Sequence, residues 1–503
     1  MPNRFVLAIA GSLLIASTVS AADLTASRQT AASKQARAGE PEFRSLYQEL
    51  VEINTTLSVG SCTEAANAMK ARLVAAGYPD SEAQVVVPEG WPKQGNLIAL
   101  LPGTDPKLKP VLLLAHIDVV EAKRDEWVRD PFKLIEEDGF FYARGASDDK
   151  AMAAVFADMM VRFRKDGYRP KRGIKLALTC GEETPNTFNG VKYLIEKHRD
   201  LIDAAFALNE GGGGRYDQKT GVYRYVSVLA AEKVYQDFTL TTTNKGGHSA
   251  RPTPDNAIYQ LAHALDKIEA HVFKVEFNET SRAYFEKFGA IEGGSTGADM
   301  IAVASSGDVA AMARLLKDPS ANAILHTNCV ATQINGGHAP NALPQRATAN
   351  VNCRIFPGHK QTEVLEELVR VIGDPGVTVE FQSKPETPGA PPPLSREVMG
   401  PIEALSRDMF PGIAVIPSIS AGATDGRTFS HPRRHTDLWR VRHVQRRRDQ
   451  QRTWPQRTYS RADADRGTRV SLPPHEAVRR RQVTRRPNNL SSSRRPTAAC
   501  RRR

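Results

Sequence analysis

The sequence predicts an α/β fold with a mostly parallel central sheet and a smaller α+β domain inserted into it. Two observations carry this prediction. In the first half of the chain, short apolar runs alternate with stretches of helical apolar spacing, which is typical of strands and helices that build a parallel sheet. Near Lys233 the pattern changes to an alternation of polar and apolar residues, which is typical of half-buried antiparallel strands.

The elements of the central sheet follow from these apolar runs. The expected strands are Asn96–Leu101, Val111–Ala115, Gly173–Thr179 and Ala204–Leu208. The expected helices are Phe43–Asn54, Thr63–Ala76, Lys150–Phe163 and Val191–His198. This order of elements predicts that residues 40–232 form the first part of the core domain.

The inserted domain is predicted to span residues 233–384. Its expected strands are Tyr235–Thr242, Asn328–Ile334, Gln345–Ile355 and Val377–Gln382, and its expected helices are Pro254–Ile268 and Thr362–Ile372. A proline-rich stretch then returns the chain to the core, whose second part is predicted at residues 394–430. That part holds a helix at Val398–Arg407 and an apolar run at Ala414–Pro417.

The N-terminus has the pattern of a secretory signal. Arg4 precedes an apolar run from Phe5 to Ile15, and small residues around Ala21 follow it. We therefore predict a signal peptide at residues 1–22 and a periplasmic or secreted protein. The alternative is a permanent membrane anchor, but the apolar run is shorter than the roughly 20 residues that span a bilayer.

The five cysteines do not have the spacing of a zinc ribbon. Cys329 and Cys353 fall in two neighbouring strand-like runs. In an exported protein they could form a disulfide, and two buried thiols are the alternative.

Imidazole and carboxylate side chains follow several of the predicted strands. They are His116 and Asp118 after Val111–Ala115, Glu182 and Glu183 after Gly173–Thr179, and Glu210 after Ala204–Leu208. Asp148 precedes the helix that begins at Lys150. Sites in open α/β sheets form at the carboxyl ends of strands. Charged groups gathered there need partners, and a pair of metal ions would satisfy them together.

Each of these motifs also has a common structural explanation. A His-x-Asp pair is often a surface pair, two adjacent glutamates often begin a helix, and Asp-Asp-Lys is often a helix cap. Their joint occurrence after successive strands favours a metal site. Two divalent ions can activate a water and polarise a carbonyl, while a neighbouring glutamate acts as general base.

Four motifs together resemble the dinuclear-zinc metallopeptidase family 20. They are Ala115-His116-Ile117-Asp118, Arg144-Gly145-Ala146-Ser147-Asp148-Asp149-Lys150, Gly181-Glu182-Glu183 and Gly246-Gly247-His248-Ser249. The family includes glutamate carboxypeptidase, carboxypeptidase S, aminoacylases and dipeptidases, and the similarity runs from about Phe43 to Phe429. The resemblance implies two Zn²⁺ ions per subunit, with Co²⁺ or Mn²⁺ as alternatives.

The resemblance also implies roles for individual residues of the core. The implied metal ligands are His116, Asp148, Glu183 and Glu210, with Asp148 bridging both ions. From geometry alone Asp118 would lie between the ions, but the resemblance implies that it orients His116. Glu182 would be the general base.

The inserted domain would be the family's ferredoxin-like lid and dimerisation domain. In it, His248 would reach the substrate carbonyl oxygen, often from the partner subunit, and steady the oxyanion. Asn341 and Arg354 match positions that hold substrate, and an arginine fork suits a free α-carboxylate. Without the resemblance, a Gly-Gly-His turn and a strand arginine would be given structural roles. Gly422–Asp425 resembles the family's late substrate loop.

The C-terminal residues 431–503 have an unusual composition. They contain 22 arginines, no lysine and five acidic residues, so the formal net charge of +12 belongs to this tail and the preceding residues are net negative. The family's last metal ligand is a histidine in an Ala-His-Gly-like loop, and the tail has no such motif. A disordered basic tail and a nucleic-acid-binding patch are two interpretations.

A shifted reading frame is a third interpretation of the tail. Read one nucleotide downstream, the codons of residues 452–461 permit Ala-His-Gly-Leu-Asn-Glu-Arg-Ile-Pro, and those of residues 435–446 permit a strand. Trp454 followed by Pro455 must then encode glycine. We hypothesise a frameshift between about Phe429 and His435, in the gene or in its reported sequence.

The sequence therefore predicts an exported zinc-dependent hydrolase that cleaves the amide bond next to a C-terminal amino acid, as metallo-carboxypeptidases and dipeptidases do. An N-acyl-amino-acid amidohydrolase and a catalytically impaired family member without its last metal ligand are the alternatives. The expected partners are a peptide or N-acyl amino acid substrate and a second copy of the chain, bound through the lid domain. We expect no nucleic-acid partner, and no membrane association after signal cleavage.

Overall fold

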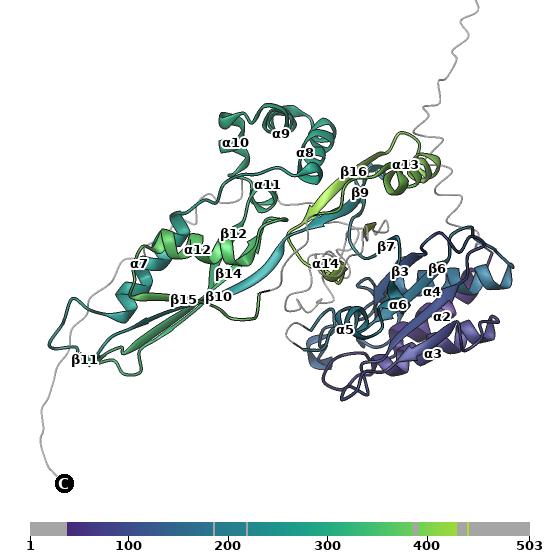
Figure 1. The fold of residues 1–503 in the computed structure, drawn as a ribbon, viewed down its shortest axis with the longest axis horizontal. Helices are drawn as coiled ribbons and strands as arrows, with labels where there is room; N and C mark the ends of the chain where they lie inside the picture. The colour runs from purple at the N-terminus through teal and green to yellow at the C-terminus, as the bar shows by residue number, and fades with distance from the viewer. Residues whose placement is uncertain (1–37, 185–186, 218–219, 386–390, 430–439, 442–503) are drawn as a thin grey trace, which may run out of the picture. The chain divides into compact units, whose positions relative to one another are not determined.

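Figure 1 shows the computed structural model of the chain. The structure describes residues 38–184, 187–217, 220–385, 391–429 and 440–441. The expected signal peptide, the part of the tail predicted to hold the Ala-His-Gly loop, and most of the proline-rich stretch around Pro388 lie outside these residues. Within the described ranges, no helix is both long enough and apolar enough to cross a bilayer.

A six-stranded sheet, the core sheet, forms the centre of the first domain in the strand order β1-β2-β6-β3-β7-β17. Its strands are β1 (Ala83–Val86), β2 (Asn96–Leu101), β3 (Val111–His116), β6 (Ile174–Thr179), β7 (Phe206–Leu208) and β17 (Arg440–Val441). The four strands β6, β3, β7 and β17 are parallel, and β1 and β2 run antiparallel to their neighbours. The prediction of a mostly parallel sheet is confirmed.

Helices cover both faces of the core sheet because successive residues of its strands point to opposite sides. On β3, Leu113 and Ala115 pack with α2 (Glu40–Glu52), α3 (Cys62–Ala75) and α4 (Lys150–Lys165). Leu112 and Leu114 pack on the other face with α5 (Gly190–Lys197), α6 (Arg199–Ile202) and α14 (Gly426–Phe429). The near-continuous apolar sequence of this strand is thus explained by burial on both sides.

A three-stranded sheet combines two strands that precede the insert in the sequence with one that follows it. It pairs β9 (Tyr223–Glu232) with β8 (Gly213–Tyr216) and with β16 (Ala414–Ser420), and α13 (Arg396–Met409) packs on it. After Lys233 the chain continues directly from β9 into β10, so one extended segment begins the insert. A short η1 turn (Arg124–Glu126) and a β4–β5 hairpin (Ile135–Glu137, Phe140–Tyr142) complete the first domain.

The insert contains a four-stranded antiparallel sheet, the insert sheet, in the order β12-β14-β10-β15. Its strands are β10 (Val234–Thr243), β12 (Asn328–Gly336), β14 (Arg346–Ile355) and β15 (Val377–Phe381). Helices α7 (Ala257–Ala270) and α12 (Gln361–Ile372) pack on its apolar face. A two-stranded ribbon of β11 (Gly247–His248) and β13 (Ala342–Leu343) extends from it.

Four helices of the insert were not predicted. They are α8 (Glu279–Glu292), α9 (Gly294–Ser306), α10 (Val309–Leu315) and α11 (Pro319–Leu325), and they enclose an apolar cluster of their own. The side chains of Asn278, Asp308 and Asp318 cap three of them. These caps are a signal that sequence reasoning could have used, whereas α9 consists mostly of small residues and has little helical periodicity.

Two disulfides cross-link the described residues. Cys329 and Cys353 face each other in the register of β12 and β14 and are bonded, so the disulfide is the alternative that the structure shows. Cys62 and Cys180 form a second disulfide that was not predicted, which joins the start of α3 to the end of β6. Their separation of 118 residues leaves no local spacing pattern that could reveal the pair.

Only two residues of the Arg-rich tail are described. Arg440 and Val441 form β17, which pairs in parallel with β7 at the edge of the core sheet. The codons of this stretch are among those that permit a strand in the shifted frame. The frameshift itself stays a hypothesis, and the rest of the tail, for which disorder is expected, lies outside the described residues.

Candidate active site

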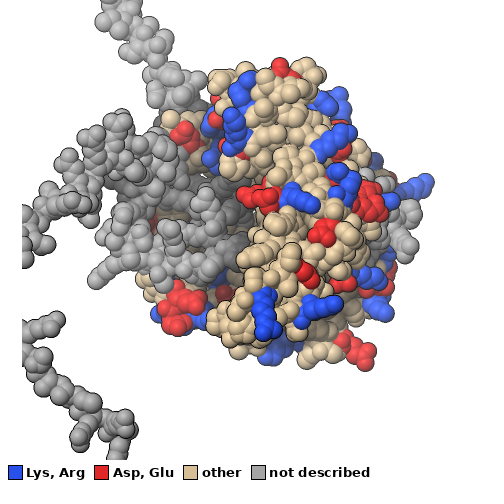
Figure 2. Space-filling model, turned by 90° about the vertical axis from the view of Figure 1, so that its left-hand side faces the viewer, with Lys and Arg blue, Asp and Glu red and all other residues tan. Residues whose placement is uncertain are grey.

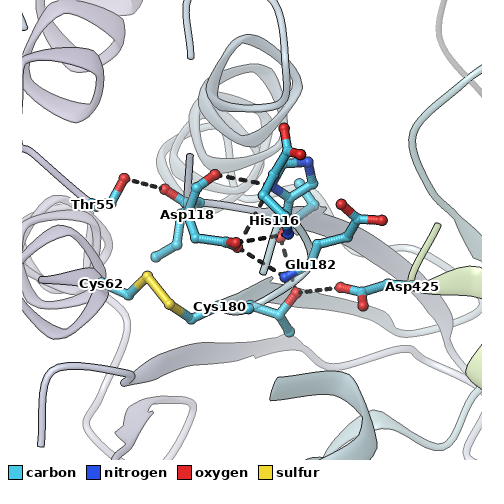
Figure 3. Close-up of polar contacts among 12 residues, drawn as sticks. Thr55, Cys62, His116, Asp118, Cys180, Glu182 and Asp425 are labelled. Atoms are coloured by element: carbon cyan, nitrogen blue, oxygen red, sulfur yellow. Dashed lines mark hydrogen bonds and ion pairs between the residues drawn. A yellow bond between two sulfur atoms is a disulfide. The ribbon is translucent and has the colours of Figure 1, made fainter. Parts of the chain in front are cut away.

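His116 is the last residue of β3 and is almost completely buried. Its Nδ1 lies 3.0 Å from the backbone oxygen of Asp118, and its Nε2 lies 3.1 Å from Oδ1 of Asp148 (Figure 3). The same Nε2 is 3.9 Å from Oε2 of Glu210, which follows β7. The imidazole therefore has one nitrogen fixed by the chain and the other directed at two carboxylates.

His116, Asp148 and Glu210 form a candidate metal-binding group. One ligand atom from each lies within 4.8 Å of the others. Imidazole nitrogen and carboxylate oxygen are a common zinc donor set. The structure thus brings together three of the four predicted metal ligands, and Glu183 is not part of this group.

The protonation of His116 also fits a cation site. Burial alone would lower its pKa, but hydrogen bonds with Asp118 and Asp148 and the nearby charge of Glu210 raise the pKa well above its ordinary value. A bound cation would take the place of that proton among the carboxylates, because metal ligands bind in their deprotonated forms. The residues present therefore suit a divalent metal.

Asp118 holds the loop that carries the two predicted glutamates. Its Oδ1 accepts a hydrogen bond from the backbone N–H of Glu182 at 3.3 Å, and its Oδ2 accepts one from Glu183 at 2.9 Å. Burial would raise the pKa of Asp118, but His116 and the backbone N–H groups of Glu183 and Gly181 hold it below its ordinary value. An ionised Asp118 therefore connects the ends of β3 and β6.

Glu182 and Glu183 lie in a region of concentrated negative charge. Burial raises the pKa of Glu182 well above its ordinary value, and the nearby carboxylates of Glu210 and Asp425 raise it further. Burial also raises the pKa of Glu183 to about 7, with Asp148 adding to the effect. A carboxyl group with a raised pKa can accept and return a proton near neutral pH, which general acid–base catalysis requires.

Asp425 is a buried carboxylate that sequence reasoning assigned only to the substrate loop. Its two oxygens accept hydrogen bonds from Asn189 Nδ2 at 2.6 Å and from Thr179 Oγ1 at 3.2 Å. Burial raises its pKa. Figure 3 shows it on the side of Glu182 that is away from Asp118. Only the fold brings this residue, 243 positions after Glu182, to the site, and no local pattern indicates that proximity.

A second polar chain connects the segment before Glu210 with the same loop. Asn209 donates from Nδ2 to Thr424 Oγ1 at 3.1 Å, and Thr424 donates from its backbone N–H to Glu232 Oε2 at 3.1 Å. All three residues are buried. This network was not predicted, and it fixes the position from which Glu210 approaches the metal group.

Further buried contacts support the segment after β3. Thr55 donates from its hydroxyl to the backbone oxygen of Ile117 at 2.6 Å, and Lys150 donates from Nζ to the backbone oxygen of Ile53 at 2.6 Å. Burial lowers the pKa of Lys150 to about 7. The Cys62–Cys180 disulfide joins the same region to the end of β6 (Figure 3). A disulfide and buried hydrogen bonds therefore hold in place the segments that carry the site.

Of the three predicted substrate residues of the insert, His248 and Arg354 lie on strands, and Asn341 lies directly before β13. His248 is exposed on β11, directly opposite Ala342 in β13, and Asn341 accepts a hydrogen bond from the Ser249 N–H through its backbone oxygen. Among the described contacts, none joins His248 or Asn341 to the metal-binding group. Arg354 lies on β14 and donates from Nη1 to the backbone oxygen of Ala421, next to the Gly422–Asp425 loop, at 3.3 Å.

Comparisons with known proteins identify the family of the chain. The model of peptidase family M20/M25/M40 matches residues 112–470, which includes the strand ends and extends past Phe429. The N-fatty-acyl-amino acid synthase/hydrolase PM20D1 of Xenopus tropicalis is 30% identical over 339 residues, which is 65% of this chain and 64% of that protein. The "Probable carboxypeptidase S-like 2" of Dictyostelium discoideum is 28% identical over 333 residues, with 65% and 63% covered.

The chain thus matches less than two thirds of the length of these two relatives. Among solved structures, the M20 family metallo-carboxypeptidase Sso-CP2 from Sulfolobus solfataricus superposes with a TM-score of 0.57 at 20% identity. That superposition covers 80% of this chain and 91% of Sso-CP2, and it shows a shared fold. The family resemblance and the mixed α/β fold predicted from the sequence are confirmed: the chain belongs to peptidase family M20/M25/M40.

Proposed function

We propose that this protein is a metal-dependent hydrolase that cleaves an amide bond whose amine product is an amino acid with a free α-carboxylate. The observation that carries the proposal is the group of His116, Asp148 and Glu210, whose ligand atoms lie within 4.8 Å of one another beside Glu182. A metal site next to a carboxyl group with a raised pKa has the parts that amide hydrolysis needs.

Several residues of the site have separate roles in the proposed hydrolysis. When bound, Zn²⁺ would supply Lewis-acid polarisation of the scissile carbonyl and would acidify the attacking water. Glu182 accepts a proton from that water and returns it to the leaving amine. Asp118 holds the backbone of Glu182 and Glu183 through two hydrogen bonds, which keeps the base at a fixed distance from His116. His248, which the insert supplies, stabilises the oxyanion.

A peptide with a free C-terminal residue is our first substrate class. Arg354 is partly buried and next to the Gly422–Asp425 loop, and a guanidinium in that position suits a carboxylate. The similarity to a protein named as carboxypeptidase S-like agrees with this choice. The reaction would release the C-terminal amino acid.

An N-acyl amino acid is the second substrate class. It presents the same carboxylate and the same amide nitrogen, with an acyl group in place of the peptide. The name of the Xenopus tropicalis relative, an N-fatty-acyl-amino acid synthase/hydrolase, favours this class. The two classes differ only in the acyl side, so the residues named above serve both.

A substrate panel tests the proposal and separates the two classes. The purified chain is assayed with dipeptides, longer peptides and N-acyl amino acids, before and after treatment with a chelator and after zinc is restored. We expect turnover that requires a free carboxylate and that is lost and regained with the metal. Turnover that survives complete removal of the metal contradicts the proposal.

The metal content tests the alternative of an impaired enzyme. We propose two Zn²⁺ ions per subunit, with Asp148 shared and Glu183 on the second ion. If the frameshift is present in the gene, the protein lacks the family's last histidine ligand. We then expect at most one tightly bound ion and little turnover. Elemental analysis gives the count, and the nucleotide sequence across residues 429–461 shows whether the Ala-His-Gly frame exists.

We also propose a homodimer formed through the insert. β12 is an edge strand of the insert sheet, and Val330 and Ile334 on it are 57% and 65% exposed. An exposed apolar edge strand readily pairs with another chain. Light scattering should give twice the chain mass, and lysine at both positions should give the monomer; a wild-type monomer contradicts this proposal.

Export to the periplasm or the medium completes the proposal. Two disulfides between the described cysteines support an oxidising location. Mass spectrometry of the protein recovered from the producing cells should give an N-terminus near Ala22. An intact Met1 on the folded, oxidised protein contradicts cleavage.

A further inference from the structure

Five polar side chains form a connected network on the face of the insert sheet opposite α7 and α12. They are Tyr235 and Asp237 on β10, and Asn350, Asn352 and Arg354 on β14. The register sets Tyr235 opposite Arg354 and Asp237 opposite Asn352. Directly opposite residues of an antiparallel pair point to the same face, so the network follows from the pairing of the two strands.

The guanidinium of Arg354 is held by three contacts. Its Cζ lies 4.6 Å from the centre of the Tyr235 ring, so the ring covers one face of the guanidinium plane. Its Nε donates to Asn352 Oδ1 at 3.3 Å, and its Nη1 donates to the backbone oxygen of Ala421 at 3.3 Å. These contacts define both the plane of the group and its rotation within that plane.

Asp237 joins the contacts that hold Arg354. Its Oδ1 accepts hydrogen bonds from Nδ2 of Asn352 at 2.8 Å and from Nδ2 of Asn350 at 2.9 Å, and its Oδ2 accepts one from the Tyr235 hydroxyl. Burial and this carboxylate raise the pKa of Tyr235 to about 12, so its hydroxyl remains a donor at neutral pH. The aspartate therefore fixes both the ring and the amide that touch Arg354.

This arrangement leaves one side of the guanidinium for a ligand. Arginine has five N–H donors, and the described hydrogen bonds of Arg354 use one on Nε and one on Nη1. The N–H groups of Nη2 and the second one of Nη1 remain, and together they match the two oxygens of a carboxylate. A carboxylate would bind in the plane that the Tyr235 ring defines.

We propose that Tyr235 and Asp237 are positioning residues that set the specificity for a free carboxylate by holding the Arg354 guanidinium. The inference rests on the proposed function, in which Arg354 binds the α-carboxylate of the substrate. The tyrosine supplies the surface on which the guanidinium lies, and the aspartate prevents the ring and Asn352 from turning away. Neither residue touches the reacting bond.

Binding of a matched ligand pair tests the inference without requiring turnover. The probes are an N-sulfonyl amino acid, whose sulfonamide resists hydrolysis, and its carboxamide, both titrated calorimetrically into the zinc-loaded full chain. Wild-type protein should bind the carboxylate about 10- to 100-fold more tightly than the carboxamide. Tyr235→Leu should reduce this ratio about 3- to 30-fold, with unchanged affinity for the carboxamide.

Two milder variants separate the parts of the network. Tyr235→Phe keeps the ring and loses the hydrogen bond to Asp237, so the ratio should fall only about 2- to 10-fold. The affinity ratio of Asp237→Asn should fall by a similar factor. Both keep the size of the side chain, so they carry the test if Tyr235→Leu does not fold. Tyr168→Leu is the control. Tyr168 lies outside the insert and is 49% exposed, so the affinity ratio of this variant should equal that of the wild-type protein.

The possible outcomes are distinguishable. An unchanged ratio in all three variants overturns the inference, and so does an equal loss of affinity for both ligands, which indicates a merely structural role. A wild-type protein that binds both ligands equally contradicts the carboxylate-binding role of Arg354. A wild-type protein that binds neither ligand contradicts the proposed substrate class. The last two results therefore refer to the proposed function rather than to Tyr235 and Asp237.

Discussion

The carboxyl edge of the core sheet and the polar face of the insert sheet gather charged side chains in different ways. At the core edge, His116 ends its strand and Glu182 and Glu210 follow theirs, so loops decide how these groups meet. On the insert sheet, Tyr235 and Arg354 lie within paired strands, so the strand register determines which side chains meet. Positions set by loops need additional support, and the core edge has it in Asp118, Thr424 and the Cys62–Cys180 bond.

The two regions also differ in charge. The core edge holds an excess of carboxylates, and the pKa values of Glu182 and Glu183 are raised by burial and by their neighbours. The insert face balances Asp237 against Arg354 within one network. The first region is therefore suited to bind a cation, whereas the second is suited to present a fixed cation of its own. Figure 2 shows charges of both signs intermixed on the visible described surface.

The largest expected effect comes from removing the proton acceptor at the core edge. Glu182→Gln keeps the size of the side chain and its backbone hydrogen bond to Asp118, but it cannot accept a proton. We expect kcat to fall about 10²- to 10⁴-fold with the bound metal retained. Steady-state kinetics and elemental analysis check this, and a fall of less than tenfold would assign the proton to another group.

The disulfides provide a direct comparison of stability between the two regions. Cys62–Cys180 closes a separation of 118 residues in the core, and Cys329–Cys353 closes one of 24 residues in the insert. Replacing both cysteines of a pair with alanine should lower the free energy of unfolding by about 5 kcal/mol for the first and about 3 kcal/mol for the second. Denaturant titrations measure both, and the reverse order would contradict the loop-length argument.

The free energy of unfolding should depend on pH through Lys233, at the junction between the core and the insert. Lys233 lies between β9 and β10, and its buried Nζ donates to the His326 backbone oxygen and to Asn328. Burial lowers its pKa to about 7 from the ordinary 10.5. Between these values the unfolded chain holds a proton that the folded protein lacks, so the free energy of unfolding rises with pH.

The expected rise is about 1.4 kcal/mol per pH unit, or about 3 kcal/mol from pH 7 to pH 9. Lys233→Met should lack this contribution. Unfolding of both proteins at several pH values isolates it, because the other titrating groups are common to both. Parallel pH curves for the two proteins would show that Lys233 keeps its proton when folded.

The smallest expected effect concerns the support of the metal group. Asp118→Asn keeps the shape of the side chain but replaces one of the two oxygens that accept hydrogen bonds from Glu182 and Glu183. We expect the metal affinity to fall about 10- to 100-fold, which is typical for residues that orient ligands. Competition with a chelator of known affinity measures it. As a matched control, Asp166→Asn changes a carboxylate that ends α4 away from the site and should leave the affinity unchanged.

The comparison also explains what could be predicted from the sequence. The core strands are continuous apolar runs that end in charged residues, so both the sheet and the positions of His116 and Glu210 could be inferred. The insert sheet has a clear alternation, and its pairing puts Arg354 on the polar face. Among the missed helices, α9 consists mostly of small residues, and α10 and α11 are seven residues long, so they have little apolar periodicity.

Two long-range contacts beside the site were not predicted. Asp425 reaches Thr179 across 246 residues, and Cys62 reaches Cys180 across 118, so neither contact has a local sequence signal. The ligand roles of His116, Asp148, Glu183 and Glu210 remain predictions, as do the roles of His248, Asn341 and Arg354 in substrate binding.

The Cys62–Cys180 bond has one more consequence, for limited proteolysis. The 3₁₀ turn at Arg124–Glu126 is exposed and lies between the two cysteines in the sequence. A protease that cuts after Arg124 separates β3 from β6 in the chain, yet the cystine still joins the fragments. Electrophoresis would then show one band without reductant and two bands with it, so a nicked preparation would pass as intact on a non-reducing gel.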